Sequence, residues 1–268
     1  MSGNNTLDDD HPTFDTGIPH IARVYNYWLG GKDNYAADRE LAEKFIQADP
    51  KAVDGVRSNR AFLGRAVEFL VTQAGLRQFL DLGTGIPTAD NTHEVAQRHA
   101  PASRIVYVDN DPIVLAHARA LLTSSLPAVT SYVDANVHDP ATILEAAART
   151  LDFSEPVGIM MLGIMNFVLD NAEAAAIVQH VLGGVASGSY LAMSHPTTEL
   201  GGEANAEAMR FWNEHAKPPI RARTGAEVRQ LLAGVELVEP GLVSCALWRP
   251  DTADARRVPH YGAVGRKR

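Results

Sequence analysis

Three aspartates stand at the ends of short apolar segments, the position from which side chains reach a ligand in an open α/β sheet. Asp81 comes just before a turn that runs from Gly83 to Gly85, Asp109 ends the next apolar segment, and Asp134 ends the third. Glycines at such a turn let the backbone approach a ligand closely and adopt conformations that other residues avoid. A Gly-x-Gly pair alone is also what a tight strand-to-helix turn needs, but packing alone does not explain an acid at three successive strand ends.

The residues around the turn indicate which ligand it suits. A dinucleotide fingerprint has a third glycine where this chain has Thr88, preceded by Pro87. The carboxylate of Asp81 suits a cationic amino-acid group better than a pyrophosphate. Asp109 stands where acids accept hydrogen bonds from the two ribose hydroxyls. The polar pair Asp134 and Asn136 offers partners to an adenine edge. The pattern therefore favours a ligand with a nucleoside part and an amino-acid part.

Alternating apolar segments and helical patterns must hold these acids at one edge of a sheet. Strands are predicted over 78–82, 104–108, 129–133, 157–162 and 189–194, with helices between them over 88–99, 112–122, 140–150 and 172–185. Two further helices (203–215 and 224–233) and two late strands (235–238 and 261–264) follow. Strands that are nearly all apolar and alternate with helices are typical of a mostly parallel sheet covered on both faces. The fold class is therefore a doubly wound α/β domain with a helical N-terminal extension.

The segment before the first strand is predicted to contain a disordered tail and helices but no strand. Residues 1–12 are polar and acidic and predict a disordered tail, whereas 36–48 and 58–74 predict helices. We expect residues 13–76 to form a helical extension that belongs to one structural domain with the core, 77–268. An aromatic stretch within it ends in a Gly-Gly turn, and its candidate functional residues are Tyr25, Tyr27, Trp28, Lys32 and Asp33. These residues suit a lid over a site; the alternative is an aromatic helix packed on the sheet with a polar turn after it.

Composition excludes several other classes of protein. The chain has 268 residues, a formal net charge of −8, and one cysteine, Cys245, so an internal disulfide and a cysteine-cluster metal site are excluded. A net negative charge makes nucleic acid a poor expected partner. The histidines show no metal-ligand spacing, and we expect no metal site. The absence of a signal peptide and of a long apolar run predicts a cytoplasmic protein without membrane contact.

Several segments resemble known cofactor motifs. Residues 79–85, 106–112 and 132–136 resemble the first three motifs of class I S-adenosylmethionine-dependent methyltransferases. A closer resemblance extends over about 12–267, to an actinobacterial family of S-adenosyl methyltransferases once described only as a domain of unknown function. It is carried by residues 23–34, 59–63, 83–88 and 261–267. The resemblance implies a seven-stranded Rossmann-like fold, S-adenosyl-L-methionine as cofactor and S-adenosyl-L-homocysteine as product. It implies no substrate.

The resemblance also implies which residues contact the cofactor, at the ends of the first four strands. They are Asp81, Gly83, Thr84 and Gly85 around the amino-acid part, Asp109 at the ribose, Asn110 beside the adenine, Asp134 and Ala135 at the adenine ring, and Leu162 and Gly163 under the sulfonium.

The methyl acceptor is expected over the ends of the fourth and fifth strands. Methyl transfer depends largely on positioning and desolvation, and a general base is needed only when the nucleophile is protonated. His195 and His20 are candidate bases, although His195 can also be a polar strand end and His20 reaches the site only if the lid folds over it. Asn166 can orient an acceptor amine or hydroxyl but cannot act as a base. The helical segment 203–219 either walls the acceptor pocket, covers the sheet, or forms the surface of a homodimer.

These features favour a methyltransferase that acts on a small molecule by direct methyl transfer. One alternative is a sensor or regulatory protein that binds S-adenosylmethionine without catalysis. A second alternative, a nucleotide-dependent oxidoreductase, is disfavoured because the third glycine is absent and because Asp81 stands near the turn.

Overall fold

The predicted apolar segments pair into one sheet in the computed structural model, which describes residues 15–116 and 130–268. Its strand order is β3-β2-β1-β4-β5-β8-β6, and β7 pairs with β8 beside this path. The strands are β1 (Gln78–Leu82), β2 (Arg104–Asp109), β3 (Thr130–Asp134), β4 (Gly158–Leu162), β5 (Tyr190–Pro196), β6 (Val235–Leu237), β7 (Val243–Ser244) and β8 (His260–Lys267).

Strands β1 to β5 run parallel, and β8 is antiparallel to its neighbours β5, β6 and β7. The described residues thus form a mostly parallel sheet of eight strands, one more than the seven expected. The additional strand, β7, has two residues, too few to show an apolar pattern. The strand order reverses between β1 and β4, and open α/β sheets bind ligands at such a switch point. The register pairs Leu82 with Val108 and Asp109 with Asp134, so the carboxyl ends of β1, β2 and β3 lie together.

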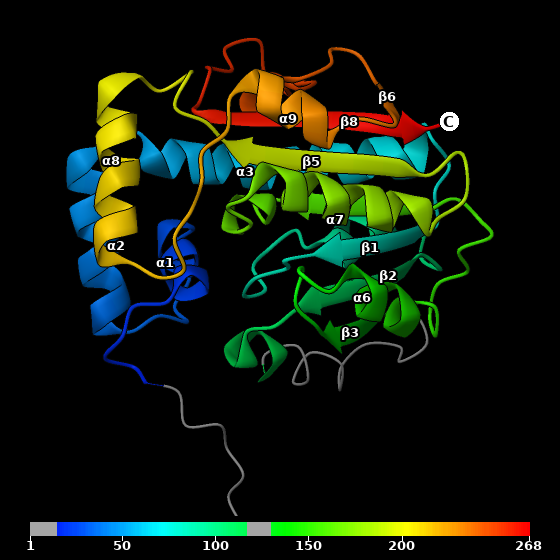
Figure 1. Ribbon diagram of the computed structural model, residues 1–268, viewed down its shortest axis with the longest axis horizontal. Helices are drawn as coiled ribbons and strands as arrows, with labels where there is room; N and C mark the ends of the chain where they lie inside the picture. Colours follow the sequence, from blue (N-terminus) through cyan, green and yellow to red (C-terminus); the bar gives the residue numbers. More distant parts are fainter. Residues whose placement is uncertain (1–14, 117–129) are drawn as a thin grey trace, which may run out of the picture.

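Helices cover both faces of the sheet, as Figure 1 shows. The first face packs against α3 (Ala52–Thr72) and α4 (Thr92–His99), and the second against α6 (Pro140–Ala147), α7 (Asn171–Gly183) and α9 (Gly225–Leu231). Alternate residues of one strand enter the two cores: Phe79 packs with the α3 side, and Leu80 and Leu82 with the α7 side. Residues 112–116 are helical, and the rest of the helix predicted for 112–122 lies outside the described residues.

A third group of helices caps the sheet. Figure 1 shows α1 (Ile21–Trp28), α2 (Ala36–Ala48) and α8 (Gly202–His215) at the end toward which the parallel strands point. Their apolar faces meet in an aromatic cluster of Trp28, Phe45 and Trp212, with ring centroids 5.1 to 6.2 Å apart. The aromatic stretch near the N-terminus is therefore a helix that packs on α2 and α8 above the strand ends. The tail predicted for residues 1–12 lies outside the described part of the chain.

The described helices include none that is long and apolar enough to span a membrane.

Candidate functional site

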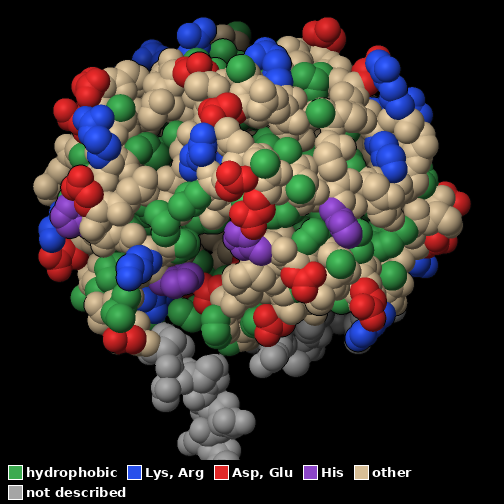
Figure 2. Space-filling view, in the orientation of Figure 1, with side chains coloured by type: hydrophobic (Ala, Val, Ile, Leu, Met, Phe, Trp, Pro, Cys, Tyr) green, Lys and Arg blue, Asp and Glu red, His purple; other side chains and the backbone are tan. Residues whose placement is uncertain are grey.

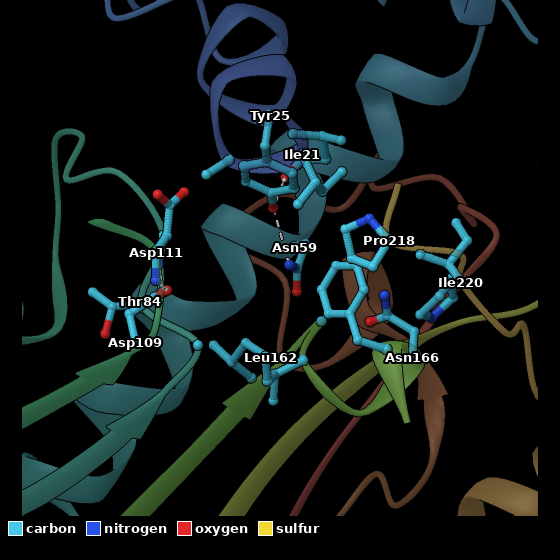
Figure 3. Close-up of a pocket in the computed structure, with 18 of the residues that line it drawn as sticks. Ile21, Tyr25, Asn59, Thr84, Asp109, Asp111, Leu162, Asn166, Pro218 and Ile220 are labelled. Carbon is cyan, nitrogen blue, oxygen red and sulfur yellow. Dashed lines mark hydrogen bonds between the residues drawn. The ribbon is translucent and has the colours of Figure 1, made fainter. Parts of the chain in front are cut away.

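A cavity of about 430 Å³ lies between the strand ends and the helical cap. Its walls come from the ends of β1, β2 and β4 and from α1, α2, α3 and α8. Figure 2 shows the surface hollowed at this place, with histidine and hydrophobic side chains around the opening. Figure 3 shows the interior, with Asp109 and Asp111 on one side, Asn166 and Ile220 on the other, and Tyr25 between them on the cap.

The glycine turn after β1 forms one wall of the cavity. Gly83 and Gly85 have φ angles of +76° and +66°, in the left-handed region that glycine tolerates best. The amide of Gly83 donates to the carbonyl of Val108 at 2.8 Å, which ties the turn to the end of β2. A Cβ on Gly83 would stand 2.6 Å from the Ile164 side chain, so this position requires glycine. On Gly85 a Cβ would meet no described atom within 4 Å, so the backbone there is open to a ligand.

Asp109, at the end of β2, is held by backbone amides: Gly85 donates to Oδ2 at 2.9 Å and Asp111 to Oδ1 at 3.0 Å. Burial raises the pKa of Asp109, and these amides oppose the rise. Asp111 accepts from the amide of Ile113 at 2.9 Å, and its Oδ2 lies 3.0 Å from Nδ1 of His20. Burial alone would raise the pKa of Asp111, but His20 and the amide lower it overall. Two carboxylates in fixed positions thus face the cavity, with lone pairs left for hydroxyl donors.

Asp81 is almost fully buried beside the turn. It accepts a hydrogen bond from Thr92 Oγ1 at 2.6 Å, and burial raises its pKa to about 6. Arg60, on α3, lines the same part of the cavity, and its guanidinium donates to the carbonyl of Ala89 and to Oδ1 of Asn91. A buried acid and an arginine therefore stand close to the glycine turn, which suits a ligand with an ammonium and a carboxylate.

A chain of hydrogen bonds connects the sheet to the cap. Ser194, on β5, donates from Oγ to Asn59 Oδ1 at 2.6 Å, and Asn59 Nδ2 donates to the hydroxyl of Tyr25 at 3.0 Å. Burial raises the pKa of Tyr25, which keeps its hydroxyl neutral. Figure 3 shows this Tyr25–Asn59 bond spanning the roof of the cavity above Leu162. The chain fixes the position of α1 over the end of β4.

The side of the cavity away from the acids is mainly apolar, and the buried side chain of Asn166 forms part of its wall. Asn166, in the short helix η1 (Met165–Phe167), is 5% exposed, and its Oδ1 has no hydrogen-bond partner among the described residues. Its main-chain carbonyl accepts from the amide of Arg221 at 2.8 Å, which holds the segment around Ile220 against η1.

His195 lies beneath the cavity and does not line it. Its Nδ1 lies 2.9 Å from the carbonyl oxygen of Pro196, and Nη1 of Arg223 donates to its Nε2 at 2.8 Å. Burial lowers the pKa of His195 to about 4, so the ring is neutral with both nitrogens engaged. The histidine that lines the cavity nearby is His260, opposite Pro196 on β8. Burial lowers the pKa of His260 to about 3, and its Nε2 is unpaired within the described structure.

The structure brings most of the expected cofactor residues together. Nine line the cavity: Asp81, Gly83, Thr84, Gly85, Asp109, Asn110, Ala135, Leu162 and Gly163. Asp134 does not, because its side chain is exposed at the end of β3.

Only some of the candidate catalytic and lid residues line the cavity. His20, Asn166, Tyr25 and Trp28 line the cavity, whereas His195, Tyr27, Lys32 and Asp33 do not. Among these, the hydroxyl of Tyr27 donates to Glu43, and Lys32 is exposed. No group of three or more histidines, cysteines or acids in residues 15–116 and 130–268 is arranged to hold a metal ion.

The lining residues that the sequence analysis missed are chiefly Asn59, Arg60 and Asp111. Asn59 and Arg60 lie 22 and 21 residues before Asp81, the nearest strand-end acid, and only the resemblance over 59–63 pointed to them. Asp111 is followed by Pro112 and a helical segment, so it reads as an ordinary helix cap in the sequence.

Comparison with known proteins relates this geometry to a family. Residues 8–268 match the family model described as S-adenosyl methyltransferase. The chain is similar to a DUF574 family protein of Streptomyces avermitilis, with 46% identity, a TM-score of 0.90 and coverage of 95% of this chain and 99% of that chain. It is also similar to a protein of Thermobifida fusca described as "a putative methyltransferase", with 41% identity, a TM-score of 0.88 and coverage of 95% and 97%.

A more distant match concerns the fold alone. Human N-acetylserotonin methyltransferase, solved in complex with S-adenosylmethionine, has 12% identity and a TM-score of 0.50, over 94% of this chain and 63% of that chain. No curated protein matches the sequence.

Proposed function

Since this chain belongs to the S-adenosyl methyltransferase family and is an S-adenosylmethionine-dependent methyltransferase, we propose that it transfers the methyl group directly to a small molecule bound in the cavity. The observation that carries the proposal is the continuity of the cavity. One wall presents the acids and the open glycine turn, and the opposite wall presents apolar side chains beneath the helical cap. Donor and acceptor sites side by side in one cavity are what direct transfer requires.

The polar wall fits the chemical groups of the cofactor. Asp109 and Asp111 offer acceptor oxygens suited to two ribose hydroxyls, and Oδ2 of Asp111 has only the His20 ring near it within the described structure. Asp81 suits the ammonium group, and Arg60 suits the carboxylate, because each stands beside the glycine turn with the opposite charge. We assign these four side chains to hold the cofactor.

The remaining strand-end residues complete this assignment. Gly83, Thr84 and Gly85 surround the amino-acid part, Asn110 and Ala135 the adenine, and Leu162 and Gly163 the sulfonium.

When bound, S-adenosylmethionine supplies a methyl group on a cationic sulfur, and transfer joins this methyl to a lone pair of the acceptor while the carbon–sulfur bond breaks with its electron pair staying on sulfur. The protein contributes positioning and the exclusion of water. The bond from Asn59 to Tyr25 holds the cap over the strand ends, and Asn166 faces the cavity from below. His195 is not available as a base because both of its nitrogens are engaged. We assign no side-chain base to the transfer, and the acceptor's proton is lost to bulk water when the product leaves the cavity. We assign to His20 the positioning of Asp111.

Incubation with methyl-labelled S-adenosylmethionine and a panel of small amines and phenols tests the proposal. We expect S-adenosylhomocysteine to form only when an acceptor is present, with the label on a product of low molecular mass. Label found only on added protein or nucleic acid would contradict the proposal. The variant Asp109→Ala serves as the control for transfer that depends on this cavity.

A further inference from the structure

The two walls of the cavity differ in charge. The charged lining residues Arg60, Asp81, Asp109 and Asp111 surround the glycine turn and the end of β2. We call the other part the acceptor half; it is lined by Trp28, Phe45, Phe167, Met209, Trp212 and Ile220. In the described lining of the acceptor half there is no Asp, Glu, Lys or Arg. A charged group placed there would lose its water without gaining a partner of opposite charge, which is strongly unfavourable.

Asn166 presents a buried acceptor to this half. Its Oδ1 is withdrawn from solvent and unpaired in the described structure. In Figure 3 its side chain projects from η1 toward Pro218 and Ile220, across the open space from Tyr25 and Asn59. Buried amide oxygens are nearly always hydrogen-bonded in native proteins, and an orphaned one needs an explanation. A bound ligand that donates a hydrogen bond to Asn166 Oδ1 is such an explanation.

Asn205, on α8, is a second buried amide in the cavity lining, but its Oδ1 packs against Gly201, where a Cβ would stand 2.8 Å from this oxygen. Its Nδ2 donates to Oδ2 of Asp49 at 3.5 Å, and because a carboxylate only accepts, the amide nitrogen must face Asp49. Its Oδ1 is consequently turned away from Asp49, and it is buried and without a partner among the described residues. Asp49 itself is 5% exposed and is not part of the cavity lining, so it offers no direct partner to a cationic ligand. The Oδ1 of Asn166 and the absence of charged side chains in the described lining thus characterise the acceptor half.

We propose that the methyl acceptor is an uncharged, mainly apolar molecule that donates an N–H or O–H hydrogen bond to Asn166 Oδ1. This inference rests on the proposed function, since it names the class of substrate for the same cavity. Aromatic and aliphatic side chains bind the apolar body, and the single donor fixes its orientation. A carboxylate or phosphate would place a negative charge in the acceptor half, whose described lining has no Lys or Arg to pair with it, and is strongly disfavoured. A site that hydrogen-bonds its substrate discriminates strongly against an analogue without the donor, because the buried oxygen is then left unpaired.

Three probes of nearly equal shape test the inference: 2-naphthol (a neutral donor), 2-methoxynaphthalene (neutral, without a donor) and 2-naphthoate (charged). They are titrated into the full chain saturated with S-adenosylhomocysteine. We expect 2-naphthol to bind about 10-fold more tightly than 2-methoxynaphthalene, and 2-naphthoate to bind most weakly. In Asn166→Leu the preference for 2-naphthol over 2-methoxynaphthalene should vanish. The control Gln47→Leu, an amide-to-leucine change on the exposed side of α2, should keep it.

The outcomes separate the two proposals. If S-adenosylhomocysteine does not bind, the proposed function fails. If it binds but 2-naphthoate is preferred, if no probe binds, or if Asn166→Leu keeps the donor preference, the substrate class is wrong and the proposed function stands. Because Asn166 Oδ1 has no hydrogen-bond partner within the described structure, Asn166→Leu should not lower the melting temperature of the ligand-free protein. A lowered melting temperature would show that Asn166 has a structural role and would overturn the inference.

Discussion

Replacing Asp81 with asparagine removes a buried charge and leaves the shape of the side chain nearly unchanged. Asp81 is 6% exposed and accepts a hydrogen bond from Thr92 Oγ1 at 2.6 Å, which the Oδ1 of an asparagine can also accept. Burial raises the pKa of Asp81 from 3.8 to about 6. The ionised carboxylate is therefore costly in the ligand-free protein, and we assign its compensation to the ammonium group of the cofactor.

The size of the effect follows from this pKa. At about 1.4 kcal/mol per pKa unit, ionised Asp81 lowers the free energy of unfolding by ~3 kcal/mol. The pKa in the folded state lies above that in the unfolded state, so the cost is absent below pH 3.8 and grows as the pH rises through 6. The asparagine adds an unpaired Nδ2 that costs ~1–2 kcal/mol at any pH. We expect Asp81→Asn to be less stable than the native protein near pH 4 and more stable by ~1–2 kcal/mol at pH 8.

Urea unfolding of both proteins at several pH values measures this difference, and calorimetry measures the affinity for S-adenosylhomocysteine. We expect the stability difference to change by ~3 kcal/mol between pH 4 and pH 8, while the variant binds the ligand at least ~10-fold more weakly at pH 8. Asp134→Asn, an exposed change outside the cavity, is the matched control and should alter neither quantity. A stability difference independent of pH, or unchanged ligand affinity, would refute the reasoning.

Three further substitutions test other parts of the account. Asp109→Ala removes the carboxylate held by two backbone amides and should weaken S-adenosylhomocysteine binding ~10- to 100-fold in calorimetry, whereas Asp134→Ala should bind normally. His195→Ala removes one of the acceptors of the buried Arg223 guanidinium, which keeps its bonds to Asn171 and to main-chain carbonyls, and it leaves a buried cavity; the free energy of unfolding in urea should fall by ~2–4 kcal/mol. A fully stable variant that lost only activity would indicate a base instead. Gly83→Ala forces a Cβ to within 2.6 Å of Ile164 at a φ of +76° and should lower stability by ~1–3 kcal/mol; an unchanged melting temperature would be inconsistent with the turn geometry.

The elements that the sequence predicted well have strong local signals. The strand 78–82 and the helix 36–48 agree with β1 and α2 at both ends. The predicted first residues of two helices were wrong, because a capping or tertiary contact sets where each helix begins. Helix α4 begins at Thr92 rather than at residue 88, because Asn91 and Glu94 form a capping box there. Helix α3 begins at Ala52 rather than at Ser58, because Ala52 and Val56 pack into the cap formed with α1, α2 and α8.

The sequence predicted the site residues that stand at strand ends. It did not predict those whose role depends on hydrogen bonds between residues far apart in the chain. Asp81 and Asp109 follow from their positions at the carboxyl ends of β1 and β2. Asp134 occupies the same position in β3, but its side chain is exposed, and the sequence does not reveal which side of a strand end faces the ligand. The sequence left His195 as either a candidate base or a polar strand end, because Arg223, which donates to it, is 28 residues away and reaches it only in the folded chain. Such contacts have no signature in the sequence.

Calorimetric titration of the full chain with S-adenosylmethionine, S-adenosylhomocysteine and NADH in parallel shows which class of ligand the glycine turn binds. We expect both adenosyl ligands to bind at one site per chain and NADH not to bind, because Thr88 stands in place of the third glycine and Asp81 flanks the turn, which does not suit a pyrophosphate. Binding of NADH together with no binding of either adenosyl ligand would contradict this expectation.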